Sequence, residues 1–520
     1  MIMIGDTLQI FVSMIIYMAV VIGIGLYFAK RANESSENYF LGGRTLGPLV
    51  TAMSAEASDM SGWLLMGLPG VAYWYGLSDA AWTAIGLAAG TYLNWLFIAK
   101  RLHNYSVVAD NSITLPDFFS NRFKEKNKII MIISAVFILV FFIVYASSCF
   151  VTVGKLFNAL FGFKYRYMMI LGAVFVLFYT FIGGFLAESA SDTMQAFVMI
   201  IALVAVLFVG TAAAGGATQV IENAKEIPGF FEFFGIASPA VADGMQEVIK
   251  GVPQYNAAGE YGMYTILSTL AWGLGYFGMP QVLLRFMAIR NPDELKISRR
   301  IATVWVIISL GAAVAIGIIG KAVFPTVHLT YSDSENIFIV LSTKLLPTFL
   351  AGFVLAGILA ATISSSDSYL LIAASAFSKN IYQRLIKKDA TDKEVMNVSR
   401  FVLVSICIIG IFIALDENSV IFTIVSFAWA GFGATFGPIT IFSLFWKRTT
   451  REGAIAGMLS GGIMVFVWKL ILKPMGGLFG VYELLPAFIV SCVFIYGVSM
   501  MTREPSEEIQ NEFETVRKMS

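Results

Sequence analysis

Long apolar runs are the feature that most constrains this chain. A helix needs about 20 apolar residues to cross the hydrocarbon core of a bilayer, and only a helix satisfies every backbone group within such a run. We expect thirteen segments of this kind, with approximate limits 7–29, 46–75, 78–99, 129–157, 167–187, 192–214, 260–284, 301–322, 338–376, 399–415, 419–445, 453–472 and 480–501. The sequence therefore predicts an all-α integral membrane protein with thirteen transmembrane helices.

Composition and charge support this class. Hydrophobic residues make up 58% of the chain and charged residues 13%, whereas soluble domains are about one-quarter charged. The net charge of +1 indicates no nucleic acid or acidic partner. We expect a single transmembrane domain over 1–502 in contact with the lipid bilayer, with a core at about 46–445 and additional spans at 7–29, 453–472 and 480–501. The remaining residues, 503–520, are expected to form a short cytoplasmic tail.

The distribution of basic residues predicts the orientation. If the N-terminus is outside, 26 of the 35 Lys and Arg residues fall in inside loops, Arg44 and Arg285 among them. Cytoplasmic loops carry such an excess, so the C-terminus is predicted to be cytoplasmic. The longest outside loop, about 215–259, is expected to hold short helices.

The second apolar segment carries polar residues where lipid disfavours them. Glu56, Ser58, Asp59, Ser61 and Gly62 lie near its middle. An ionisable residue at mid-membrane costs several kcal/mol unless it faces a partner or a wet cavity, and glycine weakens the helix at that point. Tight helix packing would explain the small residues but not the two acids. The pattern predicts an interrupted helix with a functional site.

The seventh segment is the other span unsuited to a plain helix. Gly273, Gly275, Gly278 and Pro280 lie within nine residues, which predicts a break or kink. The glycines spell GxGxxG, but a dinucleotide fingerprint follows a strand in a soluble unit. We therefore expect no organic cofactor.

The two interrupted segments lie five spans apart. Such a pair is typical of inverted-repeat secondary transporters, in which unwound backbone binds ions and substrate. Trp272 and Tyr276 are four residues apart and would share one face of a helix. They could form a flat aromatic wall for the ring of a small substrate, although an aromatic pair in a span more often serves packing.

Two further groups of oxygens could bind a cation. Residues 360–368 carry Ser364, Ser365, Asp367 and Ser368 on neighbouring helix faces, and sodium prefers such ligands. These hydroxyls could instead bond back to the carbonyls of their own helix. Asp192 is expected to open the sixth segment, where it could bind an ion or cap the helix N-terminus.

Several long motifs now point to a family. They are YFLGGRTLGP (39–48), ASDMSGWLLMGLPG (57–70), TLPDFF (114–119), YTFIGGFLA (179–187), WGLGYFGMPQ (272–281), RFMA (285–288) and AWAGFGATFGP (428–438). In this order they resemble the sodium/solute symporter family along almost the whole chain. The resemblance implies a leucine-transporter-type core of two inverted five-helix repeats, spans 2–6 and 7–11. It also implies substrate uptake by alternating access, driven by Na⁺, in a bacterial cell (inner or plasma) membrane.

The resemblance also implies roles for particular residues. Sodium would bind the carbonyls of Ala57, Met60 and Ala361 and the hydroxyls of Ser364 and Ser365. The site would be organised by Asp59, Ser61 and Gly62. The forms of segments 2 and 7 imply L-proline as substrate, near Trp272, Tyr276, Pro280, Tyr145 and Ser61. Arg44 corresponds to an arginine linked to coupling.

The chain departs from the family pattern at several positions. Glu56 stands where a small residue is usual, Ala190 where a Trp is usual, and Asp367 where a hydroxyl is usual, and Glu188 adds another acid nearby. The acids could be structural. Our sharper hypothesis is a second Na⁺ or H⁺ site formed by Asp192, Ser365, Asp367 and Ser368.

Other functions remain open at this stage. The chain could carry another amino acid, pantothenate or sialic acid by the same mechanism, or it could be a channel or a membrane sensor. No catalytic triad, zinc pattern or phosphate loop indicates an enzyme. The three cysteines and two histidines have no metal-ligand spacing, so Na⁺ is the one metal ion expected. We expect a monomer or a weak oligomer.

Overall fold

The computed structural model describes residues 4–32 and 35–519, and helices dominate it. In chain order the helical elements are α1 (Ile4–Ala32), α2 (Ser36–Leu41), η1 (Gly42–Arg44), α3 (Pro48–Asp59), η2 (Trp63–Gly67), α4 (Leu68–Tyr75), α5 (Leu77–Leu93), η3 (Asn94–Ile98), α6 (Ala99–Val108), α7 (Leu115–Arg122), α8 (Ile129–Phe161), α9 (Tyr165–Ala213), α10 (Ala217–Lys225), α11 (Met263–Leu270), η4 (Ala271–Gly278), α12 (Pro280–Ala288), η5 (Pro292–Glu294), α13 (Leu295–Val323), α14 (Tyr331–Ser334), α15 (Ile337–Leu345), α16 (Thr348–Ser375), η6 (Ala376–Ile386), α17 (Asp392–Ile413), α18 (Ile421–Phe445), α19 (Arg451–Val467), η7 (Trp468–Leu472), η8 (Lys473–Met475), η9 (Gly477–Gly480), α20 (Leu484–Met501) and α21 (Glu507–Met519).

The helices long enough to span a membrane form one bundle. Within the described residues, ten helical segments are long and apolar enough to cross, and Tyr165–Phe181 is a shorter apolar helix. The two predicted interrupted segments are divided into shorter pieces. One consists of α3, η2 and α4, and the other of α11, η4 and α12.

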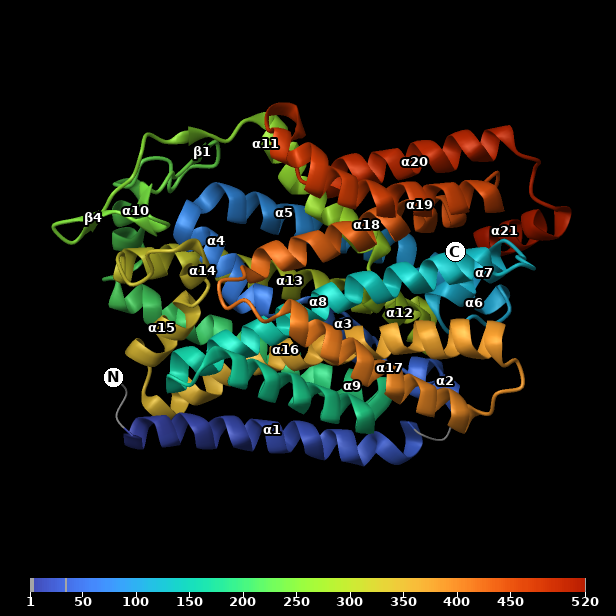
Figure 1. The fold of residues 1–520 in the computed structure, drawn as a ribbon, viewed down its shortest axis with the longest axis horizontal. Helices are drawn as coiled ribbons and strands as arrows, with labels where there is room; N and C mark the ends of the chain where they lie inside the picture. The colour runs from blue at the N-terminus through green and yellow to red at the C-terminus, as the bar shows by residue number, and fades with distance from the viewer. Residues whose placement is uncertain (1–3, 33–34, 520) are drawn as a thin grey trace.

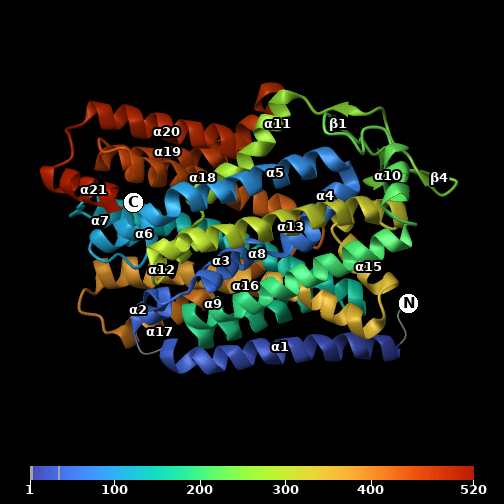
Figure 2. The ribbon, with the colours of Figure 1, turned by 180° about the vertical axis from the view of Figure 1, so that it is seen from behind.

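The long helices run side by side along the longest axis of the molecule (Figure 1). Helix α1 lies at one edge, and α19 and α20 lie at the other. Seen from behind, α3, α9, α13 and α16 lie between these edges (Figure 2). Helix α3 packs against α9, α13, α12 and α16. The first interrupted segment is therefore enclosed by other helices.

The two ends of the bundle differ in structure. One end carries the start of α1, α10 and the strand segments, whereas the other carries α6, α7 and α21 (Figure 1). The predicted outside loop and the described start of the chain thus share one end. The predicted cytoplasmic tail lies at the opposite end.

A kink divides α9 into the predicted fifth and sixth segments. It lies at Gly184, whose φ of 57° is non-helical and belongs to the region that glycine enters without strain. The second part of the helix begins there, so Asp192 lies about two turns inside it. The interpretation of Asp192 as an N-terminal cap is therefore wrong.

The predicted ninth segment, 338–376, is two helices rather than one. Helix α15 ends at Leu345, Leu346 is extended, and α16 begins at Thr348 after Pro347. Proline has no N–H to donate and disfavours a helical conformation at the preceding residue. Hydropathy alone joined the two helices because both are apolar.

The loop between α9 and α11 contains both helix and strand. The expected short helix is α10, and three small antiparallel pairs follow: β1 (Gly235–Ile236) with β6 (Gly259–Glu260), β2 (Val241–Ala242) with β3 (Met245–Gln246), and β4 (Val248–Ile249) with β5 (Val252–Pro253). Two tight turns have positive φ at both central residues, Asp243–Gly244 and Lys250–Gly251. This is the geometry of a two-residue hairpin of type I′.

The C-terminal tail folds back as α21. Its apolar side chains Ile509, Phe513 and Val516 are buried, and the helix packs against α6. The guanidinium groups of Arg101 and Arg122 lie 5.1 and 5.6 Å from the centre of the Phe513 ring. The tail is thus a helix docked on the bundle.

Candidate functional site

The first interrupted segment breaks where its sequence predicts. Helix α3 ends at Asp59, and Met60 has φ −85° and ψ 67°, outside the helical region. The chain resumes as a short π-helix at Trp63. A Cβ on Gly62 would lie 2.3 Å from the Thr152 hydroxyl of α8, so this close approach requires glycine.

The end of α3 meets the serines of α16. A helix end leaves its last four carbonyl groups without partners in the helix. The carbonyl of Ala57 accepts hydrogen bonds from the hydroxyls of Ser364 (2.8 Å) and Ser365 (3.3 Å). The Ser364 hydroxyl also lies 3.2 Å from the Ala361 carbonyl. Four of the five predicted sodium-binding residues therefore meet at one point, and Met60 lies at the adjacent break.

This donor set fits a hard cation. Carbonyl and hydroxyl oxygens are the ligands that such ions prefer, and all five residues are buried. Each hydroxyl now donates to the Ala57 carbonyl. Rotation about the Cβ–Oγ bond would turn its lone pairs toward an ion placed between the two helices.

Asp59 faces the second interrupted segment rather than the serines. Its carboxylate accepts hydrogen bonds from the Tyr276 hydroxyl (2.8 Å) and from the Gln281 amide (3.4 Å). Its backbone carbonyl accepts from the Tyr145 hydroxyl at 3.4 Å. Gln281 was not among the predicted site residues. The available signal was a polar residue directly after the proline that ends the glycine-rich break of an apolar span.

The second break is a tight helix followed by an extended residue. Residues Ala271–Gly278 form a 3₁₀ helix, and Met279 is extended before α12 begins at Pro280. A 3₁₀ helix has three residues per turn, so residues four apart do not share a face. The expectation that Trp272 and Tyr276 share an α-helical face is therefore wrong.

The two aromatic residues are joined by a third. The ring centre of Trp429 lies 6.2 Å from Trp272 and 5.0 Å from Tyr276, and its indole N–H donates to the Trp272 carbonyl at 2.8 Å. A Cβ on Gly275 would lie 2.0 Å from that indole nitrogen. The glycine thus provides the space for the Trp429 ring.

Aromatic side chains from other elements complete the wall. Trp63 lies 6.3 Å from Trp272 between ring centres, and Tyr482 stacks on Trp272 at 5.0 Å. Tyr145 packs against Tyr369 at 4.2 Å. Pro280 is not part of this cluster. It lines a separate small cavity with residues such as Leu115, Ile138 and Ile372.

A second polar group, the inner cluster, consists of Ser54, Glu188, Asp192, Arg285 and Ser368. Arg285 forms ion pairs with Glu188 and with Asp192 (3.3 Å), and donates to Ser54 (3.0 Å) and Ser368 (2.9 Å). Ser54 donates to Asp192 at 2.7 Å, and Ser368 donates to Glu188. The inner cluster thus joins α3, α9, α12 and α16.

The position of Arg285 corrects one expectation. It was counted with the inside loop, but it lies within α12 and is fully buried. Its charge faces the acids predicted for a second cation site. Asp367 is close in sequence to this cluster, and one carboxylate oxygen accepts the Ser368 N–H at 2.8 Å. The other oxygen of Asp367 and one of Asp192 have no hydrogen-bond partner among the described residues.

Two remaining predicted residues lie near the breaks. Glu56 is buried and accepts from the Trp95 indole at 3.3 Å, while its second oxygen has no partner within the described chain. Arg44 donates to the carbonyls of Met287 (2.5 Å) and Ser112 (2.7 Å). It thereby joins the chain before α3 to the end of α12. Across residues 4–32 and 35–519, no group of three or more His, Cys, Asp or Glu is arranged to hold a metal ion.

These features define a class of protein: a membrane transporter with two interrupted helices that meet at a polar and aromatic centre. The chain belongs to the sodium:solute symporter family, whose model matches residues 39–461. This is a family of transporters, not of enzymes.

Particular relatives are similar along nearly the whole chain. The sodium/proline symporters of Staphylococcus aureus strains USA300 and JH9 are each 40% identical over 515 residues, which cover 98% of this chain and 96% of the relative. A solved Na⁺-coupled sialic acid symporter in an outward-open state shares the fold, with a TM-score of 0.76 at 17% identity over 96% of this chain and 99% of that one. A nucleobase-cation-symport-1 family transporter aligns with a TM-score of 0.52 at 12% identity over 92% of this chain and 98% of its own.

Proposed function

We propose that this protein takes up L-proline together with Na⁺ by alternating access across the cell membrane. Its 40% identity to sodium/proline symporters over 98% of the chain supports this substrate. The observation that carries the proposal is the contact between the end of α3 and α16. There the Ser364 and Ser365 hydroxyls reach the Ala57 carbonyl across the break of a membrane helix.

Sodium would bind between α3 and α16. Its ligands would be the carbonyls of Ala57, Met60 and Ala361 and the hydroxyls of Ser364 and Ser365. Asp59 would act on this site without binding the ion. Together with Ser61 and Gly62 it determines the backbone conformation at the end of α3, and this conformation orients the carbonyls of Ala57 and Met60 toward the ion. The carboxylate is hydrogen-bonded to Tyr276, so the same residue would couple ion binding to the second break.

Proline would lie between the two breaks. The compact pyrrolidine ring of the substrate can pack on the wall formed by Trp272, Tyr276 and Trp429, and its ammonium group can face aromatic rings. Its carboxylate can accept from backbone N–H groups freed at a helix break. Tyr145 and Ser61 would contribute hydroxyls. Pro280 lies outside the aromatic cluster and would act on the substrate site by starting α12 directly after the second break.

The proposed architecture has thirteen spans with the N-terminus outside. Spans 2–6 and 7–11 would form two inverted five-helix repeats over about 46–445, with 7–29, 453–472 and 480–501 as additional spans. Two interrupted segments at equivalent positions support this layout, as do N- and C-terminal regions at opposite ends of the bundle (Figure 1). In that arrangement Arg44 couples the cytoplasmic ends of the two interrupted segments.

We further propose a second cation site at Asp192, Asp367 and Ser368. Glu188, Asp192 and Asp367 bring three carboxyl groups to a region with one guanidinium, Arg285. One carboxylate oxygen of Asp192 and one of Asp367 have no hydrogen-bond partner among the described residues. These oxygens could bind one more cation, either Na⁺ or H⁺. A strict ratio of one Na⁺ per proline that is unchanged in Asp367→Asn would contradict this second site.

Uptake into proteoliposomes tests the main proposal. Radiolabelled L-proline should accumulate when an inward Na⁺ gradient is imposed, and an H⁺ gradient alone should not replace it. Unlabelled pantothenate, sialic acid and other amino acids would serve as competitors, with proline expected to compete best. Accumulation driven by H⁺ but not by Na⁺ would overturn the sodium assignment.

A further inference from the structure

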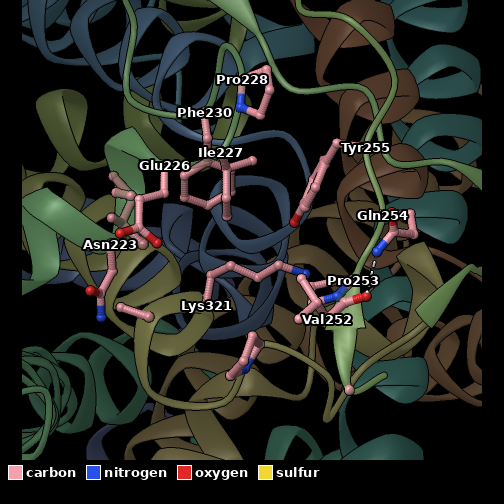
Figure 3. A pocket seen from close by; sticks show the side chains of 15 residues that line it. Asn223, Glu226, Ile227, Pro228, Phe230, Val252, Pro253, Gln254, Tyr255 and Lys321 are labelled. Atoms are coloured by element: carbon pink, nitrogen blue, oxygen red, sulfur yellow. Dashed lines mark hydrogen bonds between the residues drawn. The ribbon is translucent and has the colours of Figure 1, made fainter. Parts of the chain in front are cut away.

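A cavity of about 530 Å³ lies far from the two breaks, at the end of the molecule that carries α10 and the hairpins. Its walls come from α10 and the following turn, from strand β5 with the residues on either side of it, and from the end of α13 (Figure 3). Ile227, Phe230 and Pro253 make part of the wall apolar. Lys321, Tyr255 and Glu226 supply polar groups.

Lys321 places a buried amine in this wall. It is 2% exposed, and no carboxylate in the described chain lies within 4 Å of its ammonium group. An ammonium group has three N–H donors. The side-chain oxygen of Gln246 accepts one at 3.2 Å, and the rings of Tyr73 and Tyr255 lie 4.5 and 5.6 Å away. The helix end favours a cation here, but burying a charge without a counter-ion is costly.

Tyr255 presents a second unsatisfied group to the same cavity. Its buried hydroxyl has no hydrogen-bond partner among the described residues. Gln246 lies near this hydroxyl, but the geometry completes no bond between them. In Figure 3 the Tyr255 hydroxyl and the Lys321 ammonium lie close together, and the Glu226 carboxylate lies across the cavity from them.

The neighbouring histidine does not change this charge pattern. His328 packs edge-on against the Tyr73 ring, 5.8 Å between centres. Burial lowers the pKa of His328 to about 4, so its side chain is neutral near pH 7. The cavity therefore has an amine and a hydroxyl on one side, an exposed carboxylate on the other, and apolar surface between them, and a bound anion would favour the protonated form of the amine.

We propose that this cavity is an outer binding site for a zwitterionic amino acid. The substrate carboxylate would bind Lys321 and Tyr255, its ammonium group would face Glu226, and its apolar portion would lie against Ile227 and Phe230. The identity of the amino acid as proline rests on the proposed function. Lys321 contacts the ring of Tyr73, which belongs to α4, the outer half of the first interrupted segment. A substrate bound to Lys321 could therefore affect the position of α4.

Protection of an introduced cysteine tests this site. Val252 lines the cavity and is 59% exposed, so Val252→Cys in a Cys492→Ser background should react with a membrane-impermeant maleimide in right-side-out vesicles. L-proline without Na⁺ should slow this reaction. Cyclopentanecarboxylate and pyrrolidine, which carry only one of the two charges, should protect more weakly. Ile249→Cys on the same hairpin does not line the cavity, and its labelling should not change.

Variants then assign the contacts. Lys321→Met and Glu226→Gln should each raise the half-protecting proline concentration about tenfold, since one charge-assisted contact is worth roughly one tenfold step. Glu226 is exposed, so its variant avoids the folding risk of a buried change. The outer site would be overturned if proline did not protect Val252→Cys in the Cys492→Ser background, or if adding Glu226→Gln left this protection unaltered.

The outer site and the proposed function can fail separately. Asp59→Asn should abolish Na⁺-driven uptake while leaving the protection of Val252→Cys intact. Protection that requires Na⁺ and disappears in Asp59→Asn would report the transport centre and would overturn the outer site. Protection without any Na⁺-driven uptake of proline would instead overturn the proposed function alone.

Discussion

Two buried ion-pair systems lie on opposite sides of the helix breaks, and they join different parts of the molecule. The inner cluster around Arg285 includes Ser54 of α3 and lies on α12, so it holds one half of each interrupted segment. The other system, the outer pair, consists of Lys155 of α8 and Glu335, whose charged atoms lie 2.8 Å apart. Glu335 also accepts the N–H groups of Ile421 and Phe422 at 3.0 Å each.

The difference indicates how each side of the bundle can open. The outer pair joins α8, the start of α18 and the segment between α14 and α15. It meets the first interrupted segment at Gly70 of α4, whose carbonyl accepts from the Ser334 hydroxyl at 3.1 Å. Glu335 also packs against this glycine, where a Cβ would lie 2.9 Å from the Glu335 Cα. In the proposed transport cycle, opening beside the inner cluster would separate buried charges directly. Opening beside the outer pair would break one neutral hydrogen bond and a packing contact with α4, and would leave the ion pair itself intact.

The largest expected effect follows from removing the guanidinium of the inner cluster. Arg285→Met keeps much of the volume but leaves Glu188 and Asp192 as buried acids without a cation. Breaking a buried pair in this way costs about 3–5 kcal/mol. Denaturant titration of the purified protein in detergent should show this loss of unfolding free energy, together with loss of proline uptake.

A double variant is the control for this prediction. Arg285→Met with Glu188→Gln removes one orphaned charge and should recover part of the stability. A loss below about 1 kcal/mol in the single variant, which is the range of exposed pairs, would mean that the inner cluster does not hold the two segments together.

A smaller effect is expected at the outer pair. Glu335→Gln leaves Lys155 without its counter-ion, but the amide oxygen can still accept one N–H from the start of α18. Lys155 also keeps its bonds to Ser332. We expect a loss of about 3 kcal/mol, the low end of the range for a broken buried pair, because one ammonium group rather than two carboxylates is left without a counter-ion. The same denaturant titration checks it, and a loss as large as that of Arg285→Met would remove the distinction between the two sides.

The next effect concerns ion affinity rather than stability. Ser364→Ala removes a hydroxyl from the proposed sodium site, and losing one such contact should raise the half-saturating Na⁺ concentration about tenfold. Proline uptake at varied Na⁺ measures this shift. Ser366→Ala is the matched control on the same helix, because the Ser366 hydroxyl bonds back to the Thr362 carbonyl. Equal Na⁺ dependence in both variants would contradict the site.

The breaks themselves were predictable because their causes are local. Asp59 and Gly62 in one segment, and three glycines before Pro280 in the other, disfavour a continuous helix whatever surrounds them. Pro347 is an equally local signal, for the boundary between α15 and α16. The hydropathy pattern did not predict this boundary, because both helices are apolar. The Asp243–Gly244 pair is a further local signal, because Asp-Gly favours a two-residue hairpin turn. Only short helices were expected in this loop.

Contacts between distant segments were not predictable from local patterns. Ser364 and Ala57 are 307 residues apart, and only the family resemblance placed them together. The contact of Gln281 with Asp59 and the burial of Arg285 depend on how α12 is rotated against α3 and α9. Side-chain packing over the whole bundle fixes that rotation. A basic residue at the end of an apolar run is indistinguishable from a loop residue until the packing is known.

The smallest effect is expected at an exposed ion pair between the end of η6 and the start of α17. Lys387 and Glu394 lie 2.6 Å apart and are each about 40% exposed. The hydrogen bond and charge of Glu394 raise the pKa of Lys387. A raised lysine pKa contributes stability below the unfolded value, and that contribution is lost only as the pH rises through the folded value. Solvent screens this exposed pair and keeps its contribution small, so Lys387→Gln should change neither the denaturant midpoint nor uptake measurably. Any small loss should be constant between pH 6 and 9, because this range lies below the unfolded lysine pKa of about 10.4. A loss comparable to that of Glu335→Gln would show that proximity of charges, rather than their burial, determines what an ion pair contributes in this bundle.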